Sequence, residues 1–207
     1  MTPAPPTVSC QLPSIAAELH YRVGMAIDIH RATTPQDLAG ARELILTSLH
    51  DDQGYGFQPQ WHWDLDHLTE VYVDNPRQAM VVAVDEGTVV GTCAAGIGGS
   101  ASPPHPAWLA DHYADRANVV QLVRLVTDPR LRRKGLSRRL VDATIAFVRA
   151  EGGYRVIYLH TNAKIPGALE FWRGAGLVET YDARGDEGDD RFETVHFELP
   201  LHATVPA

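Results

Sequence analysis

Residues 119–139, VVQLVRLVTDPRLRRKGLSRR, join an apolar run to a cationic turn and constrain the fold more than any other segment. The apolar run has the composition of a buried strand and ends at Asp128 and Pro129. From Gly135 onward, apolar residues recur at helical spacing, and a second apolar run follows over 155–160. A strand, a helix and a strand in this order predict a right-handed βαβ crossover.

The turn inside this crossover reverses the local sign of charge. Six cations fall within residues 130–139, although the whole chain has a formal net charge of -8. A strand-to-helix turn presents free backbone N–H groups and the positive end of a helix dipole, so the cations favour a phosphate site. The GxxxxGKS/T and GxGxxG phosphate motifs are both absent from the sequence.

Size and composition indicate one globular domain. The chain has 207 residues, of which 44% are hydrophobic and 21% charged, as in ordinary soluble proteins. No apolar run approaches the ~20 residues of a membrane span, and no secretory signal is visible at the start. Cys10 and Cys93 form no CxxC motif, so we expect a cytoplasmic protein without a disulfide scaffold. The acidic balance disfavours broad nucleic-acid binding.

The pattern along the chain divides it into an extension and a domain. Residues 1–24 are proline-rich at the start and carry no convincing element, so we predict an N-terminal extension there, either disordered or preceding the native start. The domain is predicted over 25–207. Strands are predicted over 25–31, 79–84, 88–95, 119–127, 155–160, 177–181 and 191–199.

Helices are predicted over 34–49, 61–73, 135–150 and 165–174, and residues 96–118 are predicted to form a long loop that can hold one helical turn. Thr34 is the expected N-cap of the first helix. The helix over 135–150 is expected to bury the stripe Leu136, Leu140, Ala143 and Phe147. The predicted fold class is α/β, with a mixed sheet of about seven strands and helices on both faces.

Four segments resemble the GCN5-related N-acetyltransferase (GNAT) family. RRKGLS at 132–137 resembles its R/Q-x-x-G-x-G/A signature, and LVTDP at 125–129 resembles the strand that precedes it. ALEFW at 168–172 and GL at 176–177 resemble the family's final helix and the start of the next strand. The resemblance implies a GNAT-like fold in which two splayed parallel strands form a cleft for acetyl-CoA.

The resemblance also implies which residues hold the coenzyme. Backbone amides of the turn would bind its pyrophosphate, and Gly135 would let the backbone approach the oxygens. An N–H near Leu125 or Val126 would polarise the thioester carbonyl. Asn162 would bond the pantetheine arm or, alternatively, cap the following helix. The implied coenzyme-binding residues are Leu125, Val126, Thr127, Arg132, Arg133, Lys134, Gly135, Leu136, Ser137, Asn162 and Trp172.

Two positions depart from the family pattern. Trp172 stands where many members carry a tyrosine acid, and an indole N–H is not a usable acid. Gln121 stands where many members carry a glutamate base, and an amide cannot take up the proton. His160 and His112 are the candidate bases, because histidine changes protonation near neutral pH; the alternative for each is a structural or surface role. His105, Asp111, Asp115 and the segment 61–64 are further titratable groups near the expected acceptor site.

These features support an N-acetyltransferase that uses acetyl-CoA and acetylates a primary amine of a small molecule or peptide by direct attack. The alternative is an acyl-CoA-binding module with little or no catalysis, which the residues at 121 and 172 motivate. An acceptor linked to nucleic acid is disfavoured by the net charge of -8.

Other cofactors and nucleophiles are not expected. The sequence contains no HExxH or GxSxG motif, so no metal is predicted, and Cys93 lies in an apolar strand where it should be packed. The implied fold allows a homodimer, but no apolar stripe marks its face. Sixteen arginines against two lysines indicate a GC-rich bacterial genome.

Overall fold

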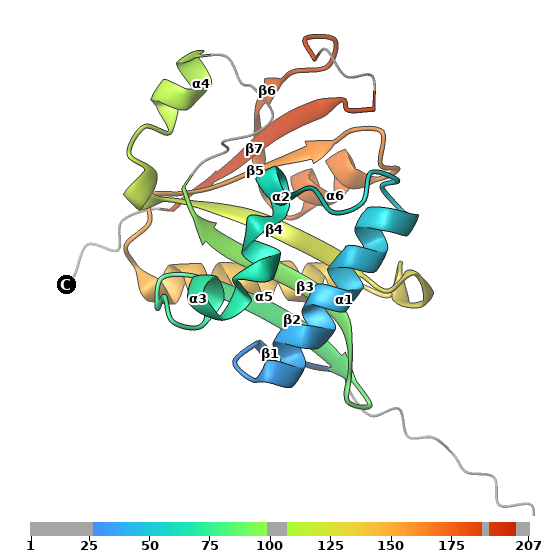
Figure 1. The fold of residues 1–207 in the computed structure, drawn as a ribbon. Coiled ribbons are helices and arrows are strands. Elements are labelled where there is room, and N and C mark those ends of the chain that lie inside the picture. Colours follow the sequence, from blue (N-terminus) through green and yellow to red (C-terminus); the bar gives the residue numbers. More distant parts are fainter. Residues whose placement is uncertain (1–26, 99–106, 188–190, 202–207) are drawn as a thin grey trace, which may run out of the picture.

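The computed structural model describes residues 27–98, 107–187 and 191–201. The predicted extension over 1–24 and the candidate His105 lie outside these residues. The described residues form one seven-stranded mixed sheet of order β1-β2-β3-β4-β5-β7-β6 (Figure 1). The strands are β1 Asp28–Arg31, β2 Ala79–Asp85, β3 Thr88–Ile97, β4 Val119–Thr127, β5 Val156–Asn162, β6 Val178–Asp182 and β7 Thr194–Pro200. The predicted mixed sheet is therefore confirmed, with β4 and β5 as its parallel pair.

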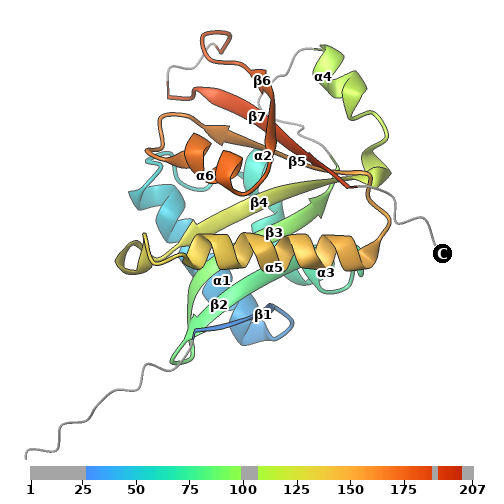
Figure 2. The same cartoon turned by 180° about the vertical axis from the view of Figure 1, so that it is seen from behind.

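Helices cover both faces of the sheet. They are α1 Pro35–Asp51, α2 Pro59–His62, η1 Trp63–Asp66, α3 Leu68–Tyr72, α4 Ala107–His112, η2 Arg116–Asn118, η3 Pro129–Leu131, α5 Leu136–Glu151 and α6 Ala168–Gly174. Helices α1 to α3 lie on the face toward the viewer in Figure 1, and α5 and α6 lie on the opposite face in Figure 2. None of the helices in these residues has the length and apolar composition needed to cross a bilayer.

Local sequence explains where the two long helices begin and end. Thr34 and Asp37 form a capping box at the start of α1, as each side chain bonds the backbone N–H of the other. Helix α5 begins after Gly135 and ends at Gly152, and both glycines have left-handed backbone conformations. The predicted apolar stripe of α5 is partly wrong. Val141, Ile145 and Val148 are buried in the core, whereas Ala143 and Phe147 are only partly buried and pack against it.

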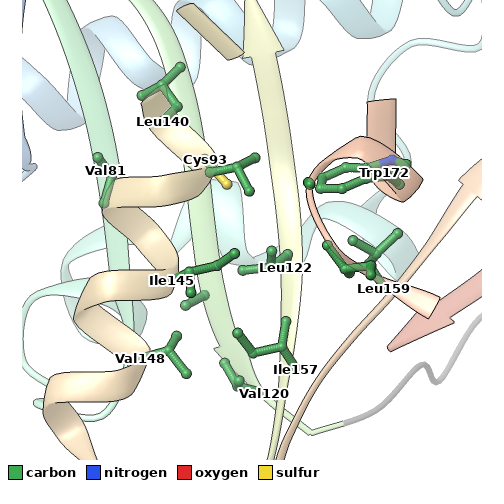
Figure 3. Close-up of a cluster of buried hydrophobic side chains, with 14 of the residues drawn as sticks. Val81, Cys93, Val120, Leu122, Leu140, Ile145, Val148, Ile157, Leu159 and Trp172 are labelled. Carbon is green, nitrogen blue, oxygen red and sulfur yellow. The ribbon is translucent and has the colours of Figure 1, made fainter. Parts of the chain in front are cut away.

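The core beneath α5 fixes the strands that build the site. Figure 3 shows Leu140, Ile145 and Val148 of α5 facing side chains of β2 to β5, with Trp172 of α6 beside Leu159. Each such aliphatic side chain contributes about 1.5–3 kcal/mol by leaving water. Cys93 lies fully buried in this cluster, as expected, and burial raises the pKa of its thiol to about 12. The thiol is therefore protonated at neutral pH.

Three predicted elements differ from the structure. The helix expected over 61–73 is broken into α2, η1 and α3, because His62 and His67 have non-helical backbone angles. The helix expected from residue 165 begins only at Ala168, because Pro166 and the left-handed Gly167 precede it. The loop expected over 96–118 contains two short helical elements, α4 and η2, in place of a single helical turn.

The sheet opens between its two parallel strands. Strands β4 and β5 are paired only where residues 119–121 meet residues 156–158. Farther along, β4 stays paired with β3 and β5 stays paired with β7. The register of β3 against β4 shifts between Thr92 and Ala94, which marks a β-bulge in β4. The expected splay of the two parallel strands is thus present, and β4 also carries a bulge.

Candidate functional site

The opening between β4 and β5 exposes two facing strand edges. Pairing stops at Gln121 and Tyr158, and each strand then continues with its other neighbour. Strand edges present backbone N–H and C=O groups that can bond an extended chain laid beside them. The gap therefore suits a long, thin ligand that runs along the strands.

The bulge sets the direction of one amide in this gap. Arg124 has a φ of 56°, and two residues of β4 here face one residue of β3. The hydroxyl of Thr92 on β3 donates to the carbonyl oxygen of Arg124 over 2.7 Å. In a trans peptide the N–H points opposite to the C=O, so the Leu125 N–H is directed away from β3 and toward the gap. Of the two amides suggested by the sequence, this geometry favours Leu125.

The turn before α5 presents a cluster of amides. Gly135 has a φ of 77°, and the first bond of the helix runs from the Arg139 N–H to the Gly135 oxygen over 3.2 Å. The amides of residues 136–138 precede that bond, and no side chain caps the helix start. A Cβ placed on Gly135 would meet no atom within 4 Å, so the space over the turn is open. The turn can accept an anionic group.

Five of the six cations of this turn fall into two groups, and the sixth, Arg139, donates to the Ile27 carbonyl oxygen. Arg130, Arg132 and Arg138 form ion pairs with Asp128, Asp52 and Asp142, at 2.5, 2.5 and 2.8 Å respectively. In the described part of the chain, Arg133 and Lys134 are exposed and have no carboxylate partner. These two side chains are available to a phosphate, whereas Arg132 is held by the end of α1.

Two candidate polar side chains meet at the start of the gap. Gln121 is on β4, and His160 lies on β5, two residues beyond the last residue of β5 that pairs with β4. The Gln121 amide nitrogen is 3.5 Å from His160 Nδ1. Because an amide nitrogen can only donate, His160 accepts at Nδ1 in this contact. The structure thus brings His160 beside the position that lacks the expected carboxylate.

His112 lies in different surroundings. It belongs to α4, and its Nε2 atom is 3.3 Å from Glu198 Oε2. The same carboxylate oxygen accepts a bond from the Tyr113 hydroxyl over 3.0 Å. This arrangement ties α4 to β7 and does not place His112 with Gln121.

Asn162 and Trp172 have structural roles in the described residues. The Asn162 side chain accepts from the amides of Lys164 and Glu193 and donates to the Arg191 oxygen. It joins the end of β5 to the residues before β7, and the alternative of a helix cap is wrong because Gly167 occupies that position. Trp172 is 7% exposed and packs edge-on against Phe171 in the core.

An aromatic cluster bridges the two sides of the opening. Tyr55 and Trp61, from the segment between α1 and η1, lie 5.9 and 6.4 Å from the ring of Phe192, which precedes β7. Sequence reasoning included Trp61 as a wall of the acceptor site but missed Phe192, because a single aromatic residue in an acidic loop has no diagnostic spacing. The cluster joins the segment before η1 to the residues that precede β7.

The segment that carries Tyr55 and Trp61 forms one wall of the opening, and His62 is a neutral structural residue of this wall. Its Nδ1 accepts the Gln58 N–H over 2.9 Å, and its ring stacks on Tyr55. Burial, followed by the charge of Arg124, lowers the pKa of His62 to about 4. It is therefore uncharged at neutral pH and holds the start of α2.

A buried ion pair connects this wall to the bulge. The Arg124 guanidinium donates to both oxygens of Asp64, at 3.0 and 2.5 Å, and to the Trp61 carbonyl at 2.8 Å. The Tyr72 hydroxyl donates to the same carboxylate over 2.8 Å. Sequence reasoning identified Asp64 as titratable but missed Arg124, because nothing in the local pattern indicates that the two meet.

Comparisons with known proteins agree with this architecture. The model of the acetyltransferase (GNAT) family matches residues 42–177. A GNAT-family acetyltransferase from Staphylococcus aureus Mu50 has a TM-score of 0.63 at 18% identity, covering 85% of this chain and 99% of its own. Similar values hold for yncA from Salmonella typhimurium, solved with its cofactor acetyl-CoA (TM-score 0.64, 14% identity, 88% and 98% coverage).

A ribosomal-protein-alanine N-acetyltransferase from Brucella melitensis is also similar, with a TM-score of 0.60 at 16% identity over 84% of this chain and 100% of its own. At such identities the structural likeness establishes the fold alone. No curated protein sequence matches the chain. The family match, however, spans well over half of the sequence, including the turn before α5 and both strands of the gap. The chain belongs to the GNAT family of acetyltransferases.

Proposed function

We propose that the protein transfers an acetyl group from acetyl-CoA to a primary amine of a small molecule or peptide by direct attack. The observation that carries this proposal is the meeting of three features at one opening. These are an amide-rich turn, a gap between parallel strands and a histidine at the mouth of that gap. The catalytic domain would occupy residues 25–207, a range that includes the family match over 42–177.

The residues of the turn and gap fit the coenzyme. The amides of residues 136–138 would bind the pyrophosphate, and Arg133 and Lys134 would add charge from outside the turn. Thr127 and Ser137, whose hydroxyl oxygens are 3.4 Å apart, hold the end of β4 next to the helix start. This contact supports a continuous path from the turn into the gap, along Val126 and the strand edge.

The acetyl end would lie at the bulge. The coenzyme supplies a thioester, and the Leu125 N–H would donate to its carbonyl oxygen. Because an ordinary thiol has a pKa of about 8.5, the sulfur can leave as a thiolate without a strong acid. That chemistry fits a site in which the family's tyrosine position is the buried Trp172.

His160 is the proposed base. An alkyl ammonium must lose a proton before it can attack, and a side chain that accepts protons near neutral pH has to lie at the gap. Because Nδ1 accepts from the Gln121 amide, Nε2 carries the hydrogen of the neutral ring, and Nδ1 would take the proton once the ammonium of the acceptor replaces this contact. The rings of Tyr55, Trp61 and Phe192 would contact the body of the acceptor on the same face.

Coenzyme binding and turnover separate this proposal from a pure binding module. Acetyl-CoA affinity is measured by calorimetry, and thiol release is followed with a panel of amines, peptide N-termini and amino sugars. Micromolar binding together with amine-dependent thiol release is the expected result. Tight binding without release on any amine would contradict the catalytic proposal and leave an acyl-CoA-binding protein.

A further inference from the structure

Arg124 is held in a conformation that its side chain does not favour. The described non-glycine residues with positive φ are Glu86, Arg124 and Arg133. Glu86 and Arg133 are exposed residues of turns, whereas Arg124 lies within β4. Such a backbone conformation persists in a strand only when surrounding contacts hold it.

The contacts of the Arg124 side chain supply that hold. Both of its bonds to Asp64 are charge-assisted and form a fork, and the two side chains are 15% and 9% exposed. Asp64 is fixed in turn by the hydroxyl of Tyr72, which is 2% exposed. The guanidinium is therefore anchored in a nearly dry site on the α1–α3 face.

The Thr92 hydroxyl donates a hydrogen bond to the carbonyl oxygen of Arg124 and so anchors the main chain of Arg124 in a second direction. Two anchors fix the peptide between residues 124 and 125, and hence the direction of the Leu125 N–H. We propose that Arg124 is a positioning residue whose bond to Asp64 holds the β4 bulge and so aims the Leu125 amide into the gap. This inference rests on the proposed function, because it assigns a support to the amide that would polarise the acetyl carbonyl.

The same guanidinium also bonds the Trp61 carbonyl oxygen, and Trp61 contacts Phe192 across the opening. One side chain thus links the amide that faces the acetyl carbonyl with the wall that faces the acceptor. A shift of the Arg124 side chain would move both at once, while the turn at Gly135 would keep its place.

The carbonyl stretching band of bound acetyl-CoA reports on this amide without any acceptor. With a carbon-13 label at the acetyl carbonyl, the band in the wild-type protein should lie below that of free acetyl-CoA. In Arg124→Met the band should return toward the free value, and kcat should fall roughly 100-fold. The dissociation constant of acetyl-CoA should change by less than about threefold, because the turn at Gly135 binds the pyrophosphate.

A matched pair of variants distinguishes positioning from general stability. Arg42→Met removes the ion pair between Arg42 and Asp66, which belongs to the same wall but is exposed to solvent. This variant should leave the carbonyl band unchanged. The triple variant Tyr72→Phe, Asp64→Leu and Arg124→Met replaces the whole buried network by apolar groups, which restores folding stability in comparable cases. It should unfold near the wild-type midpoint and still show the free carbonyl band.

Two results would overturn the inference. A lowered band in the folded triple variant would mean that the bulge holds its amide without Arg124, while the proposed function would stand. A wild-type band equal to that of free acetyl-CoA would reject the Leu125 contact, and with it both the inference and the acetyl site of the proposed function.

Discussion

The turn before α5 and the wall around α2 border the same opening in the sheet but are built from different parts of the chain. The turn consists of consecutive residues, and its binding groups are backbone amides beside an open space. The wall joins residues far apart in sequence, and its order depends on the buried side chains of Asp64, Tyr72 and Arg124. The turn is thus formed by backbone groups of neighbouring residues, whereas the wall is held by side-chain contacts between residues that are distant in the sequence.

Because of this difference, we expect the turn and the wall to serve different roles in binding. A turn of amides recognises any ligand with the right phosphate geometry, so it can stay the same while acceptors differ. A wall of side chains can be altered residue by residue, so it suits the selection of an acceptor. Variants in the two regions should therefore affect different measured quantities.

The largest effect is expected at His160. His160→Ala should lower kcat roughly 10²–10⁴-fold and remove the acidic limb of the pH–rate profile, because the proposed base is lost. Acetyl-CoA affinity should stay within about threefold of wild type, because the turn is untouched. His112→Ala is the control and should leave the acidic limb in place. An acidic limb that survives in His160→Ala would exclude His160 as the base.

Asp64→Asn tests the wall. Removing one partner of a buried ion pair leaves the Arg124 charge uncompensated, so the free energy of unfolding should fall by about 3 kcal/mol. Urea denaturation measures this loss. Asp66→Asn breaks the exposed pair with Arg42 in the same segment and should cost less than about 1 kcal/mol. Equal losses in both variants would show that the network is not a buried support.

Gly135→Asp tests the turn. The new side chain is strained at a φ of 77° and sets a carboxylate over the amides, so acetyl-CoA affinity should fall about 100-fold by calorimetry. Gly135→Asn is the matched control, because asparagine has nearly the same shape, tolerates this backbone region and carries no charge. Normal affinity in Gly135→Asp would place the pyrophosphate elsewhere.

The smallest effect concerns the pH dependence of the wall. The folded-state pKa of His62 is about 4, below its ordinary value of 6.5, so the unfolded chain binds the proton first as pH falls. Stability from the neutral ring is fully present above pH 6.5 and is lost as the pH falls toward 4. His62→Asn keeps an acceptor for the Gln58 N–H and should flatten this slope in urea titrations. A slope that stays equally steep would assign the loss to other groups.

The sequence predicts the turn side of the site well, because its determinants are local. Gly135, the strand ending at Thr127 and the stripe that begins at Leu136 lie within one short segment, and the structure keeps them together. Strands β2, β3 and β5 were also predictable, because each contains a run of apolar residues that becomes buried.

The wall was not predictable for the opposite reason. The contact of Arg124 with Asp64 joins residues 60 positions apart, and Phe192 meets Tyr55 only after β7 has paired with β5. The same long-range contacts explain why the prediction of a single helix over 61–73 was wrong. Asp64 turns inward to Arg124 and Tyr72, and the backbone breaks into η1 around it.

The short pairing of β4 with β5 affects the energetics of coenzyme capture. Only three residues of each strand are in register, so no ladder of hydrogen bonds must be broken to admit a chain between the strand ends. The receptor is preorganised, and its ordering entropy is lost during folding and not at the moment of binding. Coenzyme association should then be limited by diffusion and charge steering, with an ionic-strength dependence set by Arg133 and Lys134.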